Sequence, residues 1–159
     1  KYKVLAAGYK YNLSDVQSAM GIEQLKRLDN FLAIRNRYAK IFNDAFKTIP
    51  EIEIPKQTKE AIHSWHLYII KLKIERLRIN RDQFIGALRK ENIYTNVHFI
   101  PLHLQPFYQK NFGYRRGDFP NAEDAYKRIV SLPLYPKMTK KDILDVIEAI
   151  KRIIKYYKK

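Results

Sequence analysis

Four histidines are the side chains with the most obvious chemical potential, and they form two pairs, His63 with His66 and His98 with His103. Imidazoles at these spacings could bind zinc, but a zinc site needs three or four converging ligands and no carboxylate accompanies either pair. We therefore predict no metal site. The remaining alternatives are polar residues of the core and a role in a pocket for an anion or a cofactor.

Several other kinds of catalytic site find no support in the sequence. It has no glycine-rich phosphate loop, no nucleophile elbow and no paired acids, and it contains only 5 glycines and no cysteine. The absence of cysteine excludes disulfides, thiolate metal sites and cysteine nucleophiles, and it agrees with a reducing compartment. We take the cytoplasm as the expected location.

A second candidate site precedes the first helix signal. Residues 8–13 place Lys10, two tyrosines and the amide of Asn12 directly before Ser14. The exposed amides and the dipole at a helix start favour an anion there. The alternative is a turn, anchored by its tyrosines, that leads the chain into the helix.

These candidates must be positioned by helices whose starts are well marked. Ser14 with Gln17, Asn80 with Gln83, and Thr139 with Asp142 each have the spacing of an N-terminal capping box. We predict a first helix from Ser14 to about Phe46, with one apolar face along its whole length. Pro120 suits the first turn of a helix over residues 123–130. The expected buried faces comprise Val16, Met20, Leu25, Leu28, Leu32, Tyr38, Ile41, Phe42 and Phe46 in the first helix, and Ile143, Ile147, Ile150 and Ile154 in the last.

Strands are expected between these helices. Residues 65–73 and 95–100 are rich in aromatic and β-branched side chains, and Pro101 ends the second run. Residues 131–136 contain two prolines, so they suit an edge strand or an extended connector. We expect a surface connection at 51–60, and an ordered loop with short helical turns at 102–117. The predicted fold class is α+β, with a long N-terminal helix and a small, mainly antiparallel sheet covered by helices.

The composition bounds the possible partners. A chain of 159 residues with 46% hydrophobic residues can bury one core. The formal charge of +15 attracts anions, but Lys and Arg alternate with Asp and Glu along the chain, which favours solvated helix faces over a nucleic-acid interface. No apolar run approaches the length of a membrane span, so no membrane partner is expected. The chain starts at Lys1, and we expect it to be a piece of a longer polypeptide.

Six segments form an ordered series of motifs: GYKYNLSDVQSAMG (8–21), QLKRLD (24–29), SWHLY (64–68), VHFIPLHLQPFY (97–108), GDFPNAE (117–123) and SLPLYPKMT (131–139). Taken in order, they resemble the motifs of one protein family, the DegT/DnrJ/StrS sugar aminotransferases, which depend on pyridoxal phosphate (PLP). The resemblance covers nearly the whole chain.

This resemblance implies the C-terminal small domain of a fold-type I PLP enzyme, with residues 1–13 as an interface loop from the end of a missing large domain and residues 14–159 as the small domain. The family transfers an amino group, usually from glutamate, to a nucleotide-linked keto sugar. The lysine that forms the Schiff base with PLP lies in the large domain, so this chain is expected to hold no catalytic residue, to bind no PLP alone and to be inactive alone.

The resemblance also implies roles for particular residues. Tyr9, Lys10 and Asn12 occupy a loop that reaches the PLP phosphate of the second subunit of a homodimer. The family commonly has Asn and Arg where Lys10 and Asn12 stand. The form with Lys and Asn resembles the branch of the family that acts on a UDP-linked four-keto pentose. His98, His103 and Tyr108 match residues on the substrate side of the cleft.

Two alternatives are kept beside this interpretation. One is a basic module that binds nucleic acid, although the charge pattern argues against it. The other is a stand-alone interaction domain that has lost the enzyme's large half. The partners expected under the main interpretation are the missing domain, a second subunit, the nucleotide sugar, and glutamate or 2-oxoglutarate.

Overall fold

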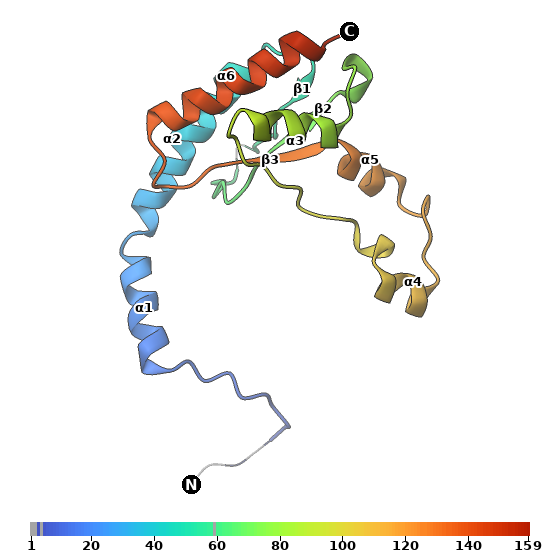
Figure 1. Cartoon of the computed structure of the whole chain (residues 1–159). Coiled ribbons are helices and arrows are strands. Elements are labelled where there is room, and N and C mark those ends of the chain that lie inside the picture. The colour runs from blue at the N-terminus through green and yellow to red at the C-terminus, as the bar shows by residue number, and fades with distance from the viewer. Residues whose placement is uncertain (1–2, 4, 59) are drawn as a thin grey trace.

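The structure is a computed structural model that describes residues 3, 5–58 and 60–159, and it has the predicted α+β class. Residues 1, 2 and 4 of the proposed interface loop lie outside the described residues. Figure 1 shows the arrangement of the elements, which are α1 (Asp15–Leu25), α2 (Leu28–Phe46), β1 (Ile52–Glu53), β2 (Tyr68–Leu72), the 3-10 helix η1 (Ile74–Arg76), α3 (Arg81–Lys90), the 3-10 helix η2 (Leu102–Leu104), α4 (Pro106–Phe112), α5 (Pro120–Arg128), β3 (Ile129–Leu132) and α6 (Lys140–Tyr157).

The sheet has the order β1-β2-β3, and both pairings are antiparallel. Tyr68 pairs with Leu132 and Ile70 with Val130, and these four side chains are buried in the core. Because side chains alternate across a strand, Ser131 and its neighbours in register face the other side of the sheet. The sheet therefore separates an apolar core from a more polar face.

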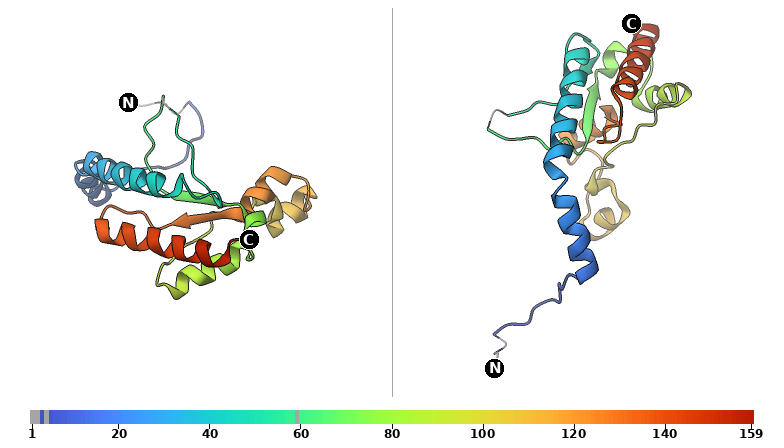
Figure 2. Two further views of the ribbon diagram at one scale, coloured as in Figure 1. Left: turned by 90° about the horizontal axis from the view of Figure 1, so that it is seen from above. Right: turned by 90° about the vertical axis from the view of Figure 1, so that its left-hand side faces the viewer.

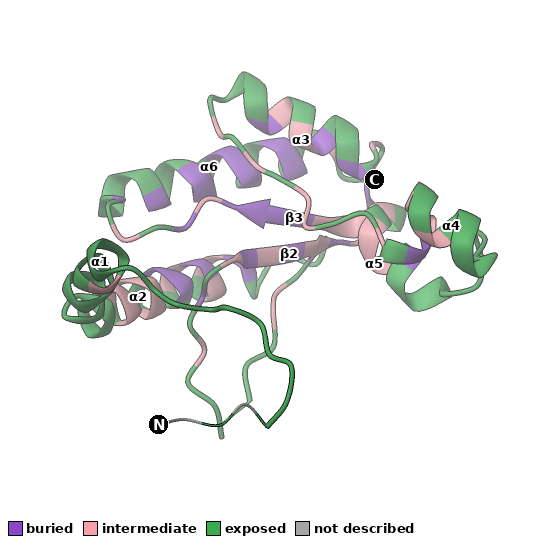
Figure 3. Cartoon of the chain, turned by 90° about the horizontal axis from the view of Figure 1, so that it is seen from below, coloured by how far each residue is buried: buried purple, intermediate pink, exposed green. Residues whose placement is uncertain are grey.

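The core is built by α2, α3 and α6 on one face of the sheet. Phe42 of α2 packs with its ring centroid 4.9 Å from that of Tyr68, and the Tyr68 hydroxyl donates to Asn43 Oδ1 at 2.6 Å. Helix α6 contacts both α2 and α3. Figure 3 shows the buried residues concentrated on β2, β3 and the inward sides of these helices. The predicted inner face of the last helix is confirmed, because Ile143, Ile147, Ile150 and Ile154 are all buried.

All three predicted capping boxes are present. The side chains of Ser14, Asn80 and Thr139 accept from the amides of Gln17, Gln83 and Asp142. In each box the third helical residue also accepts from the cap amide, so two backbone donors are satisfied at the starts of α1, α3 and α6.

The prediction of one continuous first helix is wrong. A turn at residues 26–27 separates α1 from α2, and Figure 2 shows α1 extending from α2 away from the sheet. Helix α1, all of whose residues are described, buries none of them. Its predicted apolar face lies in solvent, with Val16 71% and Met20 64% exposed. The face is apolar as predicted, but it stays exposed to solvent among the residues that the structure describes.

Three predictions between the helices also need correction. Residues 95–100 form no strand, because Asn96 alone makes a backbone bridge, to Ser131. The surface connection at 51–60 contains β1, whose Ile52 pairs with Leu72. The helix expected over 123–130 ends at Arg128, and Ile129 already belongs to β3. The local sequence pattern does not determine whether these segments are strands. Their backbone pairing with β2 or β3 in the folded chain does.

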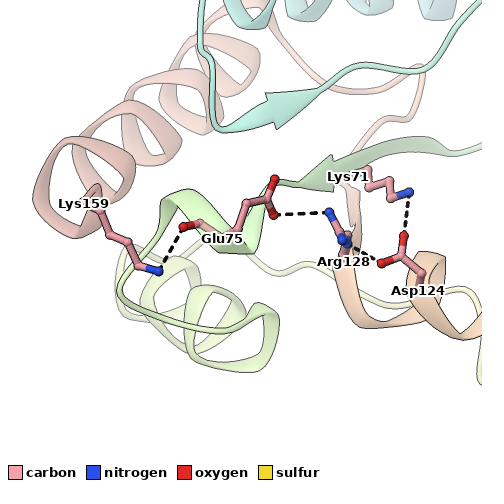
Figure 4. A network of polar contacts seen from close by, with 5 residues as sticks. All are labelled: Lys71, Glu75, Asp124, Arg128 and Lys159. Carbon is pink, nitrogen blue, oxygen red and sulfur yellow. Dashed lines mark hydrogen bonds and ion pairs between the residues drawn. The ribbon is translucent and has the colours of Figure 1, made fainter.

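Polar contacts hold the outer elements to the sheet, as Figure 4 shows. Asp124 of α5 lies 3.0 Å from Lys71 Nζ on β2 and 2.7 Å from Arg128 Nε. Arg128 Nη1 lies 3.3 Å from a Glu75 oxygen, and Lys159 Nζ donates to the Glu75 carbonyl at 2.9 Å. Within the described part of the chain, no helix has the length and apolar character needed to cross a bilayer.

Candidate functional site

His98 is fixed by the polar face of the sheet. Its Nδ1 lies 2.8 Å from the Oγ of Ser131 on β3. The backbones of Asn96 and Ser131 also exchange hydrogen bonds next to this contact. Ser131 N donates to Asn96 O at 2.8 Å, and Asn96 N donates to Ser131 O at 3.2 Å. The half-buried imidazole lines a hollow of about 370 Å³ together with His66 and Thr95. This hollow contains no acidic side chain, so it suits a hydroxyl group or an anion.

His103 lies in η2 and is buried, with only 6% of its surface exposed. Its Nε2 lies 3.1 Å from Oε1 of Glu123 on α5, and the same oxygen accepts from Gly117 N at 2.6 Å. The Gly117 amide, and then the His103 side chain, hold the pKa of Glu123 below its ordinary value. Glu123 is therefore a carboxylate acceptor at neutral pH.

Aromatic rings form the walls of the hollow beside His103. This hollow has a volume of about 320 Å³ and is lined by Tyr108, Tyr114 and Phe119 as well as His103. The ring centroid of Phe119 lies 4.8 Å from that of His103 and 5.4 Å from that of Tyr114. The structure therefore brings together two of the predicted substrate residues, His103 and Tyr108, whereas His98 lines a separate hollow.

The hydrogen-bond partners of both histidines lie on the same side of the sheet. Ser131, the partner of His98, points away from the helical core. Glu123, the partner of His103, precedes Asp124, which contacts Lys71 on that face. The Ser131 and Lys71 positions alternate with the buried Val130 and Ile70. The polar face of the sheet is thus the side on which the candidate substrate residues are arranged.

The predicted phosphate loop is exposed and lies outside both hollows. Tyr9 and Tyr11 are each 86% exposed, and their ring centroids lie 5.8 Å apart. Lys10 and Asn12 are exposed between and beside them. Figures 1 and 2 show this segment beyond the end of α1 that is remote from the sheet, and none of its described residues lines either histidine hollow. An ammonium and an amide are donors that suit a phosphate.

The members of the other histidine pair are in different surroundings. His63 Nδ1 accepts from the Trp65 amide at 2.8 Å, and its ring packs with a centroid distance of 4.1 Å against that of Trp65. His66 is exposed. Among residues 3, 5–58 and 60–159, no three His, Cys, Asp or Glu side chains gather closely enough to hold a metal ion.

A groove larger than either histidine hollow lies elsewhere, between the end of α3 and α6. It has a volume of about 680 Å³ and is lined by four acidic residues, among them Asp145 and Glu148, with Arg152 as the basic one. Arg152 Nη2 is paired with Glu91 at 2.8 Å. Because none of the four histidines lines it, its size does not make it the candidate site.

Comparison with known proteins identifies the chain. Residues 1–151 match the model of the DegT/DnrJ/EryC1/StrS aminotransferase family. The chain belongs to this family. It is 50% identical over 153 residues to the uncharacterized protein MJ1066 of Methanocaldococcus jannaschii, covering 96% of this chain and 40% of that protein. It is 46% identical over 155 residues to the spore coat polysaccharide biosynthesis protein SpsC of Bacillus subtilis, covering 97% of this chain and 40% of SpsC.

A solved structure of the family agrees with the fold. The PLP form of the putative sugar aminotransferase Spr1654 from Streptococcus pneumoniae superposes with a TM-score of 0.83 at 28% identity, covering 98% of this chain and 39% of that one. The chain thus spans about 40% of the length of the relatives it matches. The α+β architecture is that of the C-terminal portion of these aminotransferases, as predicted.

Sequence reasoning missed the residues that hold the candidate histidines of this DegT/DnrJ/EryC1/StrS domain. Ser131 lies in a segment that we expected only as an edge strand or an extended connector, and Glu123 and Gly117 lie in a motif to which no role was attached. A glutamate in the first turn of a helix is an ordinary signal of helix charge. Only the fold shows that Glu123 is buried against an imidazole 20 residues earlier in the chain.

Proposed function

We propose that this chain is the C-terminal part of a PLP-dependent aminotransferase that transfers an amino group from glutamate to a nucleotide-linked keto sugar in the cytoplasm. The observation that carries the proposal is the family match over residues 1–151, in a chain whose exposed loop and histidine hollows offer binding groups. The remaining part of the polypeptide would hold the cofactor, and a second subunit would complete a homodimer.

The residues of the loop fit the phosphate of PLP. Lys10 would supply a positive charge, Asn12 an oriented amide donor and Tyr9 a phenol. When bound, PLP supplies the electron sink that allows an amino group to be exchanged. The loop would reach the cofactor of the partner subunit, since it is exposed and far from the histidines of its own chain.

The two histidines would bind the sugar substrate. His98, held by Ser131, and His103, held by Glu123, each present an imidazole whose second nitrogen has no part in these contacts. Imidazole nitrogens accept from sugar hydroxyls or, when protonated, donate to a diphosphate. Tyr108 would add a phenol and an aromatic face beside His103. The lysine of the large domain would act as the general acid and base.

The test is amino transfer by the full-length protein. With PLP and glutamate, it should aminate a UDP-linked four-keto pentose, the substrate that the Lys10 and Asn12 pattern favours, and mass spectrometry should find the amino sugar. Lys10→Ala and Asn12→Ala should weaken PLP binding, and the larger loss identifies the phosphate contact. Failure with UDP-linked and dTDP-linked keto sugars alike would contradict the proposed substrate class.

The isolated chain supplies a second test. Incubated with PLP and then borohydride, it should show no saturable incorporation at one lysine, because the lysine of the family motif would lie outside it. Saturable labelling of a single site would contradict the division of labour between the two domains.

The charge of +15 supports one further candidate, a nucleic-acid-binding module. Such a module would bind DNA or RNA with an affinity that falls steeply with salt, because binding releases condensed counterions. A gel shift across a salt series distinguishes the two functions. We expect no retarded band at physiological salt.

A further inference from the structure

We propose that Glu123 is a positioning residue for the substrate site, because its Oε1 atom fixes the imidazole of His103 and the aromatic wall beside it at once. This proposal deepens the proposed function and rests on it. It assigns to one carboxylate both the hydrogen-bonding direction and the shape of the hollow that His103 lines.

The first step concerns the direction of the hydrogen bond. His103 and Glu123 are each only 6% exposed, so water cannot replace their contact. An ionised carboxylate only accepts hydrogen bonds, so the proton must be on Nε2, which lies 3.1 Å from Oε1. Nδ1 of the neutral ring is then an acceptor. It is the nitrogen left to receive an O–H or N–H group from a ligand.

The second step concerns the wall of the hollow. Gly117 N donates to the same Oε1 at 2.6 Å, and Gly117 has a φ of 100°, which side-chain-bearing residues rarely adopt. This bond ties down the loop between α4 and α5. Tyr114 and Phe119 lie in that loop and line the hollow with His103. Moving Oε1 would therefore shift the ring faces together with the imidazole.

The third step concerns the ligand. A hollow of about 320 Å³ with aromatic walls, lined also by His103, suits a ring that offers a hydroxyl at its edge and C–H groups on its face. A sugar has both. The sugar of the proposed substrate would thus donate a hydroxyl proton to Nδ1 while its face packs on the rings.

The experiment uses the whole 159-residue chain with ¹⁵N-labelled histidine, at a pH where imidazoles are ordinarily neutral. In the wild type, His103 should give one ring nitrogen of donor type, Nε2, and one of acceptor type, Nδ1. Its Nε2 proton should exchange slowly with solvent. The exposed His66 serves as the internal reference for a freely hydrated imidazole.

Two substitutions distinguish a role of Glu123 in orienting the His103 imidazole from a role in holding the loop at Gly117 alone. Glu123→Gln keeps an acceptor oxygen but removes the charge, so exchange of the His103 Nε2 proton should accelerate about tenfold while the Gly117 amide stays protected. Glu123→Leu removes the acceptor, and the His103 signals should move toward those of His66. Asp118→Asn is the matched control, since Asp118 accepts from Arg115 N in the same loop at 2.8 Å without touching His103.

Three results would overturn the proposal. One is a wild-type His103 protonated on Nδ1, the second is an unchanged exchange rate in Glu123→Gln, and the third is an equal acceleration in Asp118→Asn. The Glu123→Gln measurement decides the matter even where Glu123→Leu does not fold. A full-length protein that transferred no amino group would leave all these signals unchanged, so this proposal and the proposed function can fail separately.

Discussion

At the scale of single residues, Tyr68 shows how one polar atom is accommodated in the core. Its ring is fully buried, and its hydroxyl has Asn43 Oδ1 as its partner at 2.6 Å. Burial raises the pKa of the Tyr68 phenol well above its ordinary value, because the phenolate would lose its hydration. The neutral hydroxyl is therefore part of the folded state.

We predict that Tyr68→Phe lowers the free energy of unfolding by about 1 kcal/mol near neutral pH, since it leaves the Asn43 oxygen unpaired. A group whose pKa is raised by folding stabilises fully below its unfolded pKa of about 10 and loses that contribution as the pH rises further. Urea denaturation across this range should show the difference between wild type and variant shrinking. A difference that grows with pH would contradict the assignment.

Asp124 carries the opposite sign of pH dependence. The hydrogen bond from Lys71, and then the charges of Arg128 and Lys71, keep the pKa of Asp124 below its ordinary value. The contribution of this carboxylate is therefore present above the unfolded pKa of about 4 and lost as the pH falls. Its side chain is 42% exposed, so solvent screens the pairs.

Asp124→Asn should accordingly cost only about 0.5 to 1 kcal/mol at neutral pH, and this cost should shrink as the pH falls below about 4. Urea midpoints at neutral and at acidic pH measure the loss. Asp44→Asn is a suitable control, because the exposed salt bridge of Asp44 joins it to Lys47, three residues along the chain at the end of α2. An equal loss in both variants would mean that the contact between β2 and α5 adds no stability of its own.

At the scale of elements, identical caps have different consequences. Ser14 and Thr139 both close capping boxes, but α6 buries seven residues and α1 buries none. Thr139→Ala should lower the free energy of unfolding by about 1 kcal/mol. Ser14→Ala should leave global unfolding unchanged and accelerate amide exchange in the first turn of α1. A comparable global loss from Ser14→Ala would show that α1 is packed.

The caps were predictable because each depends on residues three positions apart. The same holds for the inner face of α6, where a 3.6-residue period alone selects Ile143 to Ile154. The strand predicted at residues 95–100 was wrong because a strand needs a partner over several residues. β3 forms only one bridge with this segment, between Ser131 and Asn96. The roles of Ser131 and Glu123 were unpredictable for a similar reason. Each depends on a contact 20 or more residues away.

The apolar face of α1 shows a subtler limit. Periodicity correctly indicated an apolar stripe and incorrectly placed it in the core of this chain. A pattern reports that a face is suited to burial and says nothing about which polypeptide buries it. Since the chain spans about 40% of its relatives, the partner of α1 is expected in the remaining polypeptide or in a second copy.

At the scale of the whole molecule, the chain combines a closed core with an uncovered arm. Val16, Met20 and Leu25 of α1 are between 64% and 71% exposed, and Figure 3 shows α1 mainly in green, the colour of exposed residues. The net charge of +15 opposes association at low salt, but salt screens that repulsion within about 10 Å at 0.1 M. Apolar contact then dominates. We predict that the isolated chain self-associates through α1 as the salt concentration rises.

The prediction can be checked by light scattering on the wild type and on a Val16→Lys/Met20→Lys variant. The wild type should exceed its monomer mass of 19.0 kDa increasingly with concentration, and the variant should remain monomeric. Ser18→Lys/Gln24→Lys adds the same two charges to α1 while keeping its apolar side chains, so it should still associate at high salt. Association that persists in the first variant would indicate that α1 is not the surface that mediates it. The exposed aromatic residues of α4, among them Phe107 and Phe112, would then be the candidate surface. Loss of association in both variants would attribute the effect to charge, since only the first removes apolar area.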